Sequence, residues 1–374
     1  METKLLDVRF SEDGSPEELQ EDRERMQRAI TEASEILKRG GLVAFPTETV
    51  YGLGGNALDP DAARAIYAAK GRPSDNPLIV HIADERQLDI LTDRVSETAK
   101  KLMKAFWPGP LTMIFEKKPE VPDGTTGGLA TVAVRMPDDP VTLALIRESG
   151  LCIAGPSANL SGGPSPTSWE HVYKDLNGRI DAVLQSKDSR VGIESTVLDL
   201  TGDVPTVLRP GWVTPEQITE VTGMKTELDP ALLVNHSRSG VAEDRREDGI
   251  NLDEPEARLL EDCKGPAPKA PGMKYKHYAP KGEMIILQGD SKAVRREAER
   301  IAIEKEAEGK KVAKLRFSDE NLAEAAHTLF AELRRCDEEN VDFIVASAVE
   351  ASDSVGFAIM NRMLKSAGYH VVRV

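Results

Sequence analysis

The sequence predicts an α/β protein of two domains, a larger one followed by a smaller one. With 374 residues, the chain is longer than most single domains. Short apolar runs alternate with helical patterns in two separate blocks, which is typical of α/β folds. Between the blocks, residues 235–269 carry many charges and little apolar periodicity. This stretch closes with a Pro/Gly-rich run at 265–272. We therefore expect a first domain at 17–223, a linker at 224–282 and a second domain at 283–374.

The first block contains alternating helices and strands. A helix is expected over 17–40, because Ile30, Ala33 and Leu37 recur at helical spacing. Another begins after Asp59, a good N-cap that is followed by proline. Further helices are expected at 96–106, at 141–148 and after a capping box of Thr167 and Glu170. The expected strands are 42–45, 78–82, 111–115, 131–135 and 151–154, with shorter ones at Val183, 197–200 and 207–208.

The second block has a regular alternation of its own. Strands are expected at 283–287, 311–315, 341–345 and 369–374, and helices at 291–309, 322–335 and around 357–365. This order predicts a small doubly wound domain. Gly289 follows the first strand without a GxGxxG turn, so no dinucleotide site is predicted there.

Composition and charge limit the class of protein. A net charge of −15 argues against non-specific nucleic-acid binding. Cys152, Cys263 and Cys336 form no CxxC pair, so neither a disulfide framework nor a structural zinc site is expected. The sequence has no apolar run of membrane-spanning length and no signal-peptide core near its start. We expect a cytoplasmic protein that does not associate with membranes.

Two polar clusters early in the first block follow expected structural elements. Residues 47–55, Thr-Glu-Thr-Val-Tyr-Gly-Leu-Gly-Gly, could let a ligand approach the backbone closely, or could simply form a glycine-rich turn. Lys70 and Arg72 enter a proline-braced loop, and such cations suit phosphate oxygens. Cations at a helix C-terminus also have a structural explanation in the helix dipole. His81, at the end of the next strand, carries little weight by itself.

Two later clusters add hydroxyl, amide and guanidinium groups. Residues 155–163 contain small hydroxyls, Asn159 and glycines, which suit a phosphate or adenine cradle or a ligand-free Ser/Gly loop. The other cluster places hydroxyls or guanidinium groups at strand ends, at 131–135, 194–197 and 208–211. No Walker A loop, kinase signature, GxSxG elbow or metal-ligand cluster is present in the sequence. Substrate positioning with electrostatic stabilisation of phosphate is the chemistry that we expect.

Taken together, the clusters resemble the YrdC-like threonylcarbamoyl-AMP synthases over residues 24–223. The matching runs are PTETVYGL at 46–53, KGRP at 70–73, NPL at 76–78, VRMP at 134–137, PSAN at 156–159, STV at 195–197 and LRPG at 208–211. A further run, PGMKYKHYAP at 271–280, resembles the linker of the longer, two-domain branch, although Ala270 replaces the usual serine. The resemblance implies a YrdC-like twisted open sheet with helices, linked to a smaller Rossmann-like C-terminal domain.

The resemblance also implies an activity and a set of site residues. The family is a nucleotidyltransferase that makes threonylcarbamoyl-AMP and pyrophosphate from L-threonine, bicarbonate and ATP, with Mg²⁺ bridging phosphates. A separate transferase then modifies tRNAs that read ANN codons, so stable tRNA binding is not expected here. The implied catalytic tetrad is Lys70, Arg72, Ser157 and Asn159. The implied ATP contacts are Arg72, Asn76, Thr131, Ser157, Ser165, Arg209 and, in the linker, Tyr275, with His277 as second choice. The implied L-threonine contacts are Thr49, His81, Arg135, Gly155 and Ser195.

Two other functions fit parts of the pattern. YrdC-like domains also occur in carbamoyltransferases of hydrogenase maturation, but those carry zinc-finger segments that the three scattered cysteines do not supply. An RNA-binding module of the same fold is the second, and the net charge of −15 and the lack of interleaved arginine and aromatic residues argue against it. For the second domain, a structural role that anchors the linker is favoured over a second active site.

Overall fold

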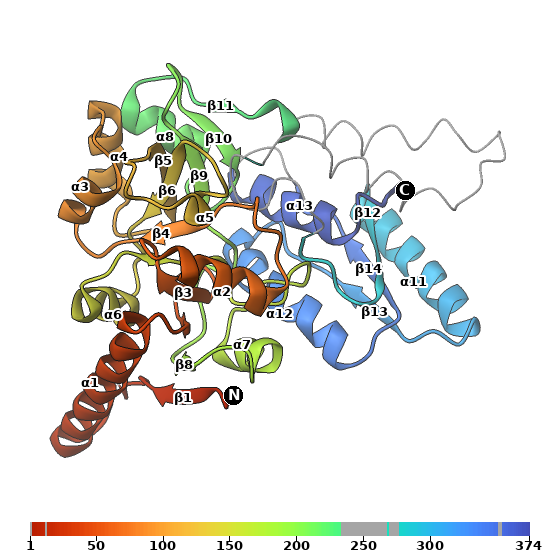
Figure 1. Ribbon diagram of the computed structural model, residues 1–374. Helices are drawn as coiled ribbons and strands as arrows, with labels where there is room; N and C mark the ends of the chain where they lie inside the picture. The colour runs from red at the N-terminus through yellow and green to blue at the C-terminus, as the bar shows by residue number, and fades with distance from the viewer. Residues whose placement is uncertain (1, 12, 233–267, 269–276, 351–353) are drawn as a thin grey trace.

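The computed structural model describes residues 2–11, 13–232, 268, 277–350 and 354–374 (Figure 1). These residues form a large α/β domain with an eleven-stranded sheet and a small α/β domain with a four-stranded sheet. The predicted α/β class is therefore confirmed. Most of the expected linker, including Tyr275, lies outside the described residues.

The large sheet mixes parallel and antiparallel neighbours in the order β1-β8-β2-β3-β7-β4-β6-β5-β9-β10-β11. Its strands are β1 (Lys4–Asp7), β2 (Val43–Phe45), β3 (Gly52–Asn56), β4 (Ile79–His81), β5 (Leu111–Glu116), β6 (Thr131–Arg135), β7 (Ile153–Ala154), β8 (Ala182–Gln185), β9 (Thr196–Asp199), β10 (Thr206–Arg209) and β11 (Glu227–Leu228). The parallel pair β4 and β6 sets His81 opposite Arg135 at one edge of the sheet.

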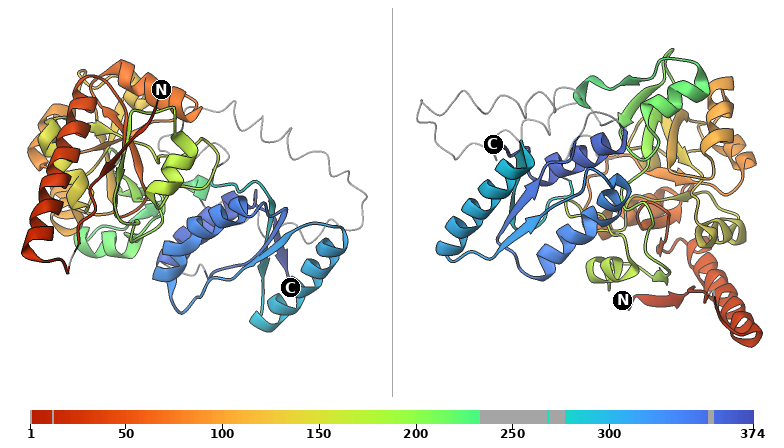
Figure 2. Two further views of the ribbon diagram at one scale, coloured as in Figure 1. Left: turned by 90° about the horizontal axis from the view of Figure 1, so that it is seen from below. Right: turned by 180° about the vertical axis from the view of Figure 1, so that it is seen from behind.

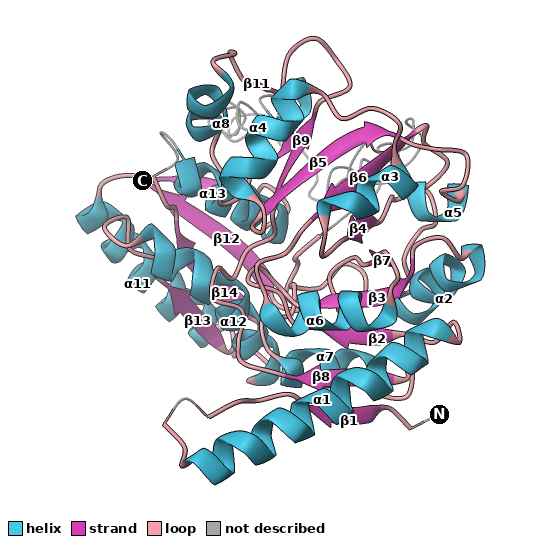
Figure 3. Ribbon diagram, turned by 90° about the vertical axis from the view of Figure 1, so that its left-hand side faces the viewer, coloured by secondary structure: helices cyan, strands magenta, loops and turns pink. Residues whose placement is uncertain are grey.

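Helices cover both faces of this sheet (Figure 3). They are α1 (Pro16–Lys38), α2 (Pro60–Lys70), α3 (Leu88–Leu91), α4 (Glu97–Phe106), α5 (Asp123–Thr126), α6 (Pro140–Ser149), α7 (Trp169–Leu176) and α8 (Pro215–Thr222), with a 3₁₀ turn at Glu85–Gln87. Alternate residues of β2 point to opposite faces: Val43 packs in the core with α1 and α6, and Ala44 in the core with α2 and α4. No helix of the described residues is long and apolar enough to span a bilayer.

One predicted helix start is wrong. The capping box of Thr167 and Glu170 does not form, because α7 begins one residue later than that box requires. Ser168 is the N-cap, and its hydroxyl accepts a hydrogen bond from the His171 amide at 3.4 Å. The Thr167 amide instead donates to Nδ1 of His171 at 3.3 Å. Neighbouring serine and threonine residues are both good caps, so local sequence does not choose between them.

Three strands lie where none was predicted: β1, β3 and the two-residue β11, which pairs in parallel with β10 inside the range expected to be linker. β1 pairs in parallel with β8, so the large sheet includes residues that precede 17. β3 occupies the second half of the glycine-rich run and pairs antiparallel with both β2 and β7. Its glycines disfavour a strand by propensity, but here they admit the ring of Phe45: a Cβ on Gly52 would lie 2.5 Å from Cζ of Phe45.

The small domain has the predicted alternation in full. Its elements are β12 (Glu283–Gln288), α11 (Ser291–Ala307), β13 (Val312–Leu315), α12 (Leu322–Glu338), β14 (Phe343–Ser347), α13 (Ser354–Ser366) and β15 (Val371–Arg373). The four strands are parallel and take the order β13-β14-β12-β15. Short apolar strands that alternate with amphipathic helices make such a domain predictable from sequence.

The two domains pack against each other through α12 and α13 (Figures 1 and 2). Val50, Val191 and Ile193 of the large domain share one buried apolar cluster with residues of the small domain, among them Leu329 and Phe330. At Gly192 the two backbones nearly touch, since a Cβ there would lie 2.4 Å from the Cα of His327. Gly192 also has a φ of +82°, which a residue with a side chain rarely adopts.

The contact at Gly192 predicts a specific sensitivity of the domain interface. Gly192→Ala is expected to lower stability by about 1–3 kcal/mol, because the added methyl group must displace the backbone of α12. The midpoint of thermal unfolding measures this effect. Gly202→Ala is the matched control, because a Cβ at Gly202 meets no atom within 4 Å. An equal midpoint for the two variants would contradict a tight contact at Gly192.

Candidate active site

A cavity opens where strand ends of the large sheet face His277 and Tyr278, near the end of the expected linker. We call it the site cavity. Its lining residues are Thr47, Thr49, Val50, Tyr51, Gly52, Arg72, Ile79, His81, Arg135, Gly155, Pro156, Ser157, Glu194, Ser195, Arg209, His277 and Tyr278. The predicted residues among them are Thr49, Arg72, His81, Arg135, Gly155, Ser157, Ser195, Arg209 and His277, the second choice in the linker. The predicted residues Lys70, Asn76, Thr131, Asn159 and Ser165 are outside this lining set, and Tyr275 is outside the described residues.

Arg135, at the end of β6, is fixed by three groups. Its Nη1 donates to Oγ1 of Thr49 at 2.9 Å, and its Nε donates to the carbonyl oxygen of Gly109 at 3.2 Å. Its Nη2 forms an ion pair with Glu48 at 2.7 Å, and only 4% of the arginine side chain is exposed. That contact lacks the alignment of a hydrogen bond, so Nη2 and both carboxylate oxygens of Glu48 have no hydrogen-bond partner among the described residues. The guanidinium group therefore keeps N–H donors for an incoming anion.

His81 forms an uncharged part of the cavity wall beside Arg135. Burial, with a further contribution from the nearby Arg135, lowers the pKa of His81 to about 3. The ring packs edge-on against Phe45 with 5.3 Å between ring centroids, and its Nδ1 has no hydrogen-bond partner among the described residues. A Cβ on Gly155 would lie 2.9 Å from Phe45 and 3.4 Å from Nδ1 of His81. Glycine at this position therefore keeps the cavity open beside a neutral imidazole.

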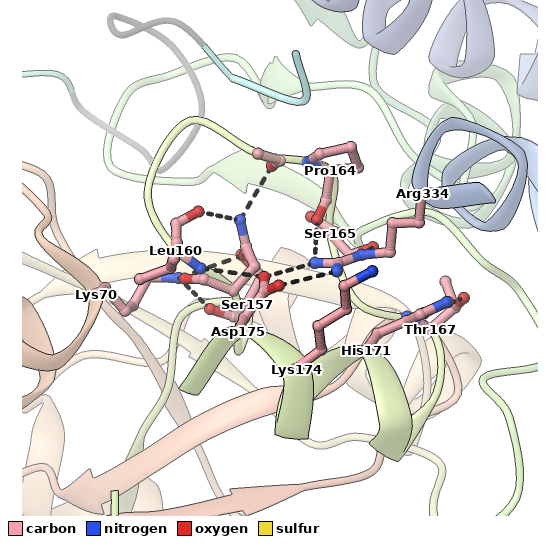
Figure 4. A network of polar contacts seen from close by, with 12 residues as sticks. Lys70, Ser157, Leu160, Pro164, Ser165, Thr167, His171, Lys174, Asp175 and Arg334 are labelled. Atoms are coloured by element: carbon pink, nitrogen blue, oxygen red, sulfur yellow. Dashed lines mark hydrogen bonds and ion pairs between the residues drawn. The ribbon is translucent and has the colours of Figure 1, made fainter. Parts of the chain in front are cut away.

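Lys70 and Asn159 hold the loop that carries Ser157, and Figure 4 shows Lys70 beside this loop. The Lys70 ammonium donates to the carbonyl oxygens of Ser157 and, at 2.6 Å, of Asn159. The Asn159 side chain accepts from Oγ of Ser157 at 2.6 Å and donates to the carbonyl oxygens of Leu160 and Gly163 at 2.7 and 3.0 Å. Burial lowers the pKa of Lys70 well below its usual value. Both side chains thus shape the loop, while Ser157 itself lines the cavity.

Arg72 lies between the cavity and the start of β4. Its Nη2 donates to the carbonyl oxygens of Asn76 and Pro77 at 3.3 and 3.1 Å, and its Nε is buried without a partner among the described residues. Burial lowers its pKa to about 10, so the group stays charged at neutral pH. The register of β4 and β6 pairs Ile79 with Ala133, which sets Thr131 at the level of residue 77, next to Asn76. Asn76 and Thr131 therefore lie near Arg72, at the far ends of these strands from His81 and Arg135.

Ser195 and Arg209 come from neighbouring strand ends and bind each other. Arg209 donates to the carbonyl oxygen of Ser195 from Nε at 3.1 Å and from Nη2 at 2.9 Å, and to its hydroxyl at 3.1 Å. The hydroxyl of Ser195 also lies 2.8 Å from Oγ1 of Thr112. Burial lowers the pKa of Arg209, although not enough to discharge a guanidinium group. Both residues are buried against the cavity.

Glu194 is a cavity residue that was not predicted. One of its carboxylate oxygens accepts from Oγ of Ser165 at 2.6 Å, and the other pairs with Nε of Arg362 at 3.1 Å. Burial opposes its ionisation, but Arg362 and Arg209 keep its pKa below the usual value. Ser165 thus reaches the cavity indirectly, through Glu194. Glu194 directly precedes the Ser195 run and could have been considered from sequence, whereas nothing in the sequence links it to Arg362.

His277 and Tyr278 close one side of the cavity. The ring of Tyr278 packs on Phe330 of α12, with 5.2 Å between ring centroids. Burial raises the pKa of Tyr278 to about 12 and lowers that of His277 well below its usual value. Both rings are therefore uncharged at neutral pH, and Nε2 of His277 has no hydrogen-bond partner among the described residues.

The charge of the cavity wall favours anionic ligands. Arg72, Arg135 and Arg209 line it, whereas its one lining carboxylate among the described residues, Glu194, is paired with Arg362. Within the same residues no group of three or more His, Cys, Asp or Glu side chains could hold a metal ion. A divalent cation would therefore have to enter together with an anionic ligand that supplies its oxygen atoms.

Comparisons with known proteins show the family of this chain. A family model described as "Telomere recombination" matches residues 35–211, and one described as "Threonylcarbamoyl-AMP synthase, C-terminal domain" matches residues 213–368. The threonylcarbamoyl-AMP synthase of Pyrococcus abyssi is 43% identical over 94% of this chain and 98% of its own. The Bacillus subtilis enzyme is 44% identical over 92% of this chain and 94% of its own.

A solved structure extends the similarity to the whole fold. The crystal structure of P. abyssi Sua5 complexed with L-threonine matches 100% of both chains, with a TM-score of 0.84 and 40% identity. The chain belongs to the threonylcarbamoyl-AMP synthase family, in its two-domain form.

Proposed function

We propose that this chain condenses L-threonine, bicarbonate and ATP into threonylcarbamoyl-AMP and releases pyrophosphate. The observation that carries the proposal is the site cavity itself, which combines Arg135, Arg72 and Arg209 with small hydroxyl groups and a neutral histidine. Its family membership and its similarity to an L-threonine complex support the same activity. The roles of individual residues below are part of this proposal.

L-Threonine binds at the Arg135 end of the cavity. Its carboxylate accepts hydrogen bonds from the guanidinium N–H groups that lack aligned partners. Thr49 and Ser195 offer hydroxyls to the polar groups of the amino acid, and Gly155 leaves space beside His81. Because His81 is neutral, it does not repel the ammonium group of threonine when the amino acid binds.

ATP binds at the opposite end with its Mg²⁺, as one substrate. Arg72 and Arg209 contact phosphate oxygens, and Ser157 adds a hydroxyl donor. Lys70 and Asn159 act on the nucleotide by holding the Ser157 loop. Asn76 and Thr131 extend the site along the start of β4 and β6, and Ser165 supports it through Glu194. The magnesium ion is held by phosphate oxygens and water, because the described residues form no carboxylate cluster.

The reaction then depends on the alignment of the two substrates, and no protein side chain has to act as a nucleophile. The threonine amine attacks bicarbonate and forms a carbamate with loss of water. A carbamate oxygen attacks the α-phosphorus of ATP, and the bond to the β-phosphate oxygen breaks to release pyrophosphate. Arg72 and Arg209 stabilise the negative charge that develops on the phosphates. Holding both substrates in one cavity converts the second step into a reaction between neighbours.

The product is an activated intermediate that another enzyme consumes. A separate transferase passes the threonylcarbamoyl group to tRNAs that read ANN codons, and we place both enzymes in the cytoplasm. This chain then needs no stable complex with tRNA. An electrophoretic mobility shift with tRNA, with and without ATP, separates this function from that of an RNA-binding module. Tight binding that does not depend on ATP would favour the module.

The activity itself predicts a threonine-dependent release of pyrophosphate. Purified protein with ATP, Mg²⁺, L-threonine and labelled bicarbonate is expected to form labelled threonylcarbamoyl-AMP and equimolar pyrophosphate. Replacing threonine and bicarbonate with carbamoyl phosphate tests the carbamoyltransferase alternative and is expected to give no turnover above background. A rate of pyrophosphate release that is the same with and without threonine would refute the proposal.

The assignment of Arg135 predicts a selective loss of threonine binding. In Arg135→Ala the KM for threonine is expected to rise about 10- to 100-fold, since a hydrogen bond to a charged group contributes about 1.5–3 kcal/mol. The KM for ATP should change far less. Steady-state kinetics with each substrate varied in turn measures both constants.

A control is needed because the alanine variant leaves Glu48 buried without its counter-ion. The double variant Arg135→Ala, Glu48→Gln removes that charge and is expected to keep the selective threonine defect. Thermal unfolding of both variants reports any loss of fold. Equal increases of the two KM values in the double variant would show that Arg135 is not a specific threonine contact.

A further inference from the structure

Arg362 is a side chain of the small domain that ends inside the large one. It lies on α13 and is fully buried. Its Nε pairs with the Glu194 carboxylate at 3.1 Å, and its Nη2 donates to the carbonyl oxygen of Glu194 at 3.3 Å. Its Nη1 donates to the carbonyl oxygen of Pro210 and, at 3.2 Å, to that of Ala358 in its own helix. One guanidinium group thus binds two separate segments of the other domain.

These two segments carry Ser195 and Arg209. Glu194 directly precedes Ser195, and Pro210 directly follows Arg209. The segments touch, because a Cβ on Gly211 would lie 2.3 Å from the amide nitrogen of Thr196. The hydrogen bonds from Arg209 to Ser195 join the segments on the cavity side, and Arg362 joins them from behind.

The geometry of this contact requires arginine. Nε and the two terminal nitrogens donate in different, fixed directions, whereas a lysine ammonium is a point donor on a flexible stem. A buried ion pair is a poor way to gain stability, because the cost of desolvation offsets much of the attraction. The domains already have another buried arginine contact: Arg334 of α12 pairs with Asp175 at 2.8 Å and donates to the carbonyl oxygen of Pro164 at 2.6 Å (Figure 4). Docking alone therefore does not account for Arg362.

We propose that Arg362 is a positioning residue for the reaction. By holding the carbonyl oxygens of Glu194 and Pro210 and the Glu194 carboxylate, it keeps Ser195 and Arg209 in the geometry that binds threonine and ATP. It also neutralises Glu194, which would otherwise repel phosphate groups from the cavity wall. The inference rests on the proposed function of the cavity, and it gives the small domain a direct part in forming the site.

The test is Arg362→Lys, which keeps the positive charge and removes the donors that the guanidinium group holds in fixed directions. Its KM values for both threonine and ATP are expected to rise about 10- to 100-fold, which is the range found for residues that orient the ligands of a metal ion. Isothermal titration calorimetry with threonine alone and with ATP alone is expected to show matching losses of affinity. A purely structural role predicts a lower thermal midpoint and a smaller active fraction, with unchanged KM values and affinities.

Two control variants separate positioning from general damage. Arg335→Lys makes the same change on the exposed face of α12, where Arg335 pairs with Glu332 and Glu339. Glu338→Gln weakens the exposed contact between the domains with Lys174, which is 3.1 Å long. Both controls are expected to retain wild-type KM values. If Arg362→Lys does not fold, Arg362→Met with Glu194→Gln replaces it, because this pair leaves no buried charge without a partner.

A double-mutant cycle with Ser195→Ala gives an independent readout. If Arg362 acts through Ser195, the loss of threonine affinity caused by Ser195→Ala is expected to be smaller in the Arg362→Lys background than in the wild type. Additive losses, or an Arg362→Lys enzyme with wild-type KM values and affinities, would overturn the inference. An inactive wild-type protein would instead refute the proposed function. The affinities for threonine and ATP measured by calorimetry would still show whether Arg362 positions the binding groups.

Discussion

The site depends on buried cations that are held mainly by backbone carbonyl oxygens. Carbonyl groups orient an ammonium or guanidinium group through their dipoles without cancelling its charge, whereas a carboxylate would neutralise it. The pairs are Lys70 with Ser157 and Asn159, Arg72 with Asn76 and Pro77, and Arg209 with Ser195. Arg135 differs, because it donates to the carbonyl oxygen of Gly109 and is also ion-paired with the Glu48 carboxylate. The wall therefore remains positive in a protein whose net charge is −15. This local excess suits substrates that carry phosphate and carboxylate groups.

The same contacts fix loops that would otherwise have few constraints. The loop after β7 has little apolar content of its own. Its shape comes from the hydrogen bonds that Lys70 donates to it and from those that the Asn159 side chain makes with other residues of the loop. A cation contributed by α2 thus defines the position of a hydroxyl contributed by a loop almost ninety residues later, at Ser157. This is why we assign Lys70 and Asn159 to loop support and keep Arg72 and Ser157 as cavity residues. Preorganisation of this kind reduces the entropy lost when a ligand binds.

The small domain also supplies buried cations that bind backbone carbonyl oxygens. Arg334 and Arg362 extend from its helices to carbonyl oxygens of the large domain, at Pro164 and Pro210. Tyr278, near the end of the expected linker, packs on Phe330 of α12 and also lines the cavity. The cavity lining thus comes from the large domain and from His277 and Tyr278 of the expected linker, and the small domain supports this lining from behind. A doubly wound domain without a nucleotide fingerprint can serve in this way because its helices present long side chains on one face.

The sequence by itself determined the α/β class, every helix and strand of the small domain, and the runs that supply Thr49, Arg72, Arg135, Ser157, Ser195 and Arg209. The class and the elements of the small domain follow from local periodicity, and the runs of site residues follow from polar residues after strands together with their resemblance to the family. Only the tertiary structure decided that Gly52–Asn56 is a strand, that Lys4–Asp7 joins the sheet, and that Glu194 is paired with Arg362. The physical reason is the range of the interactions. Strand pairing and buried ion pairs join residues as much as 178 positions apart, as the register of Lys4 with Ala182 shows, and no local pattern records such partners.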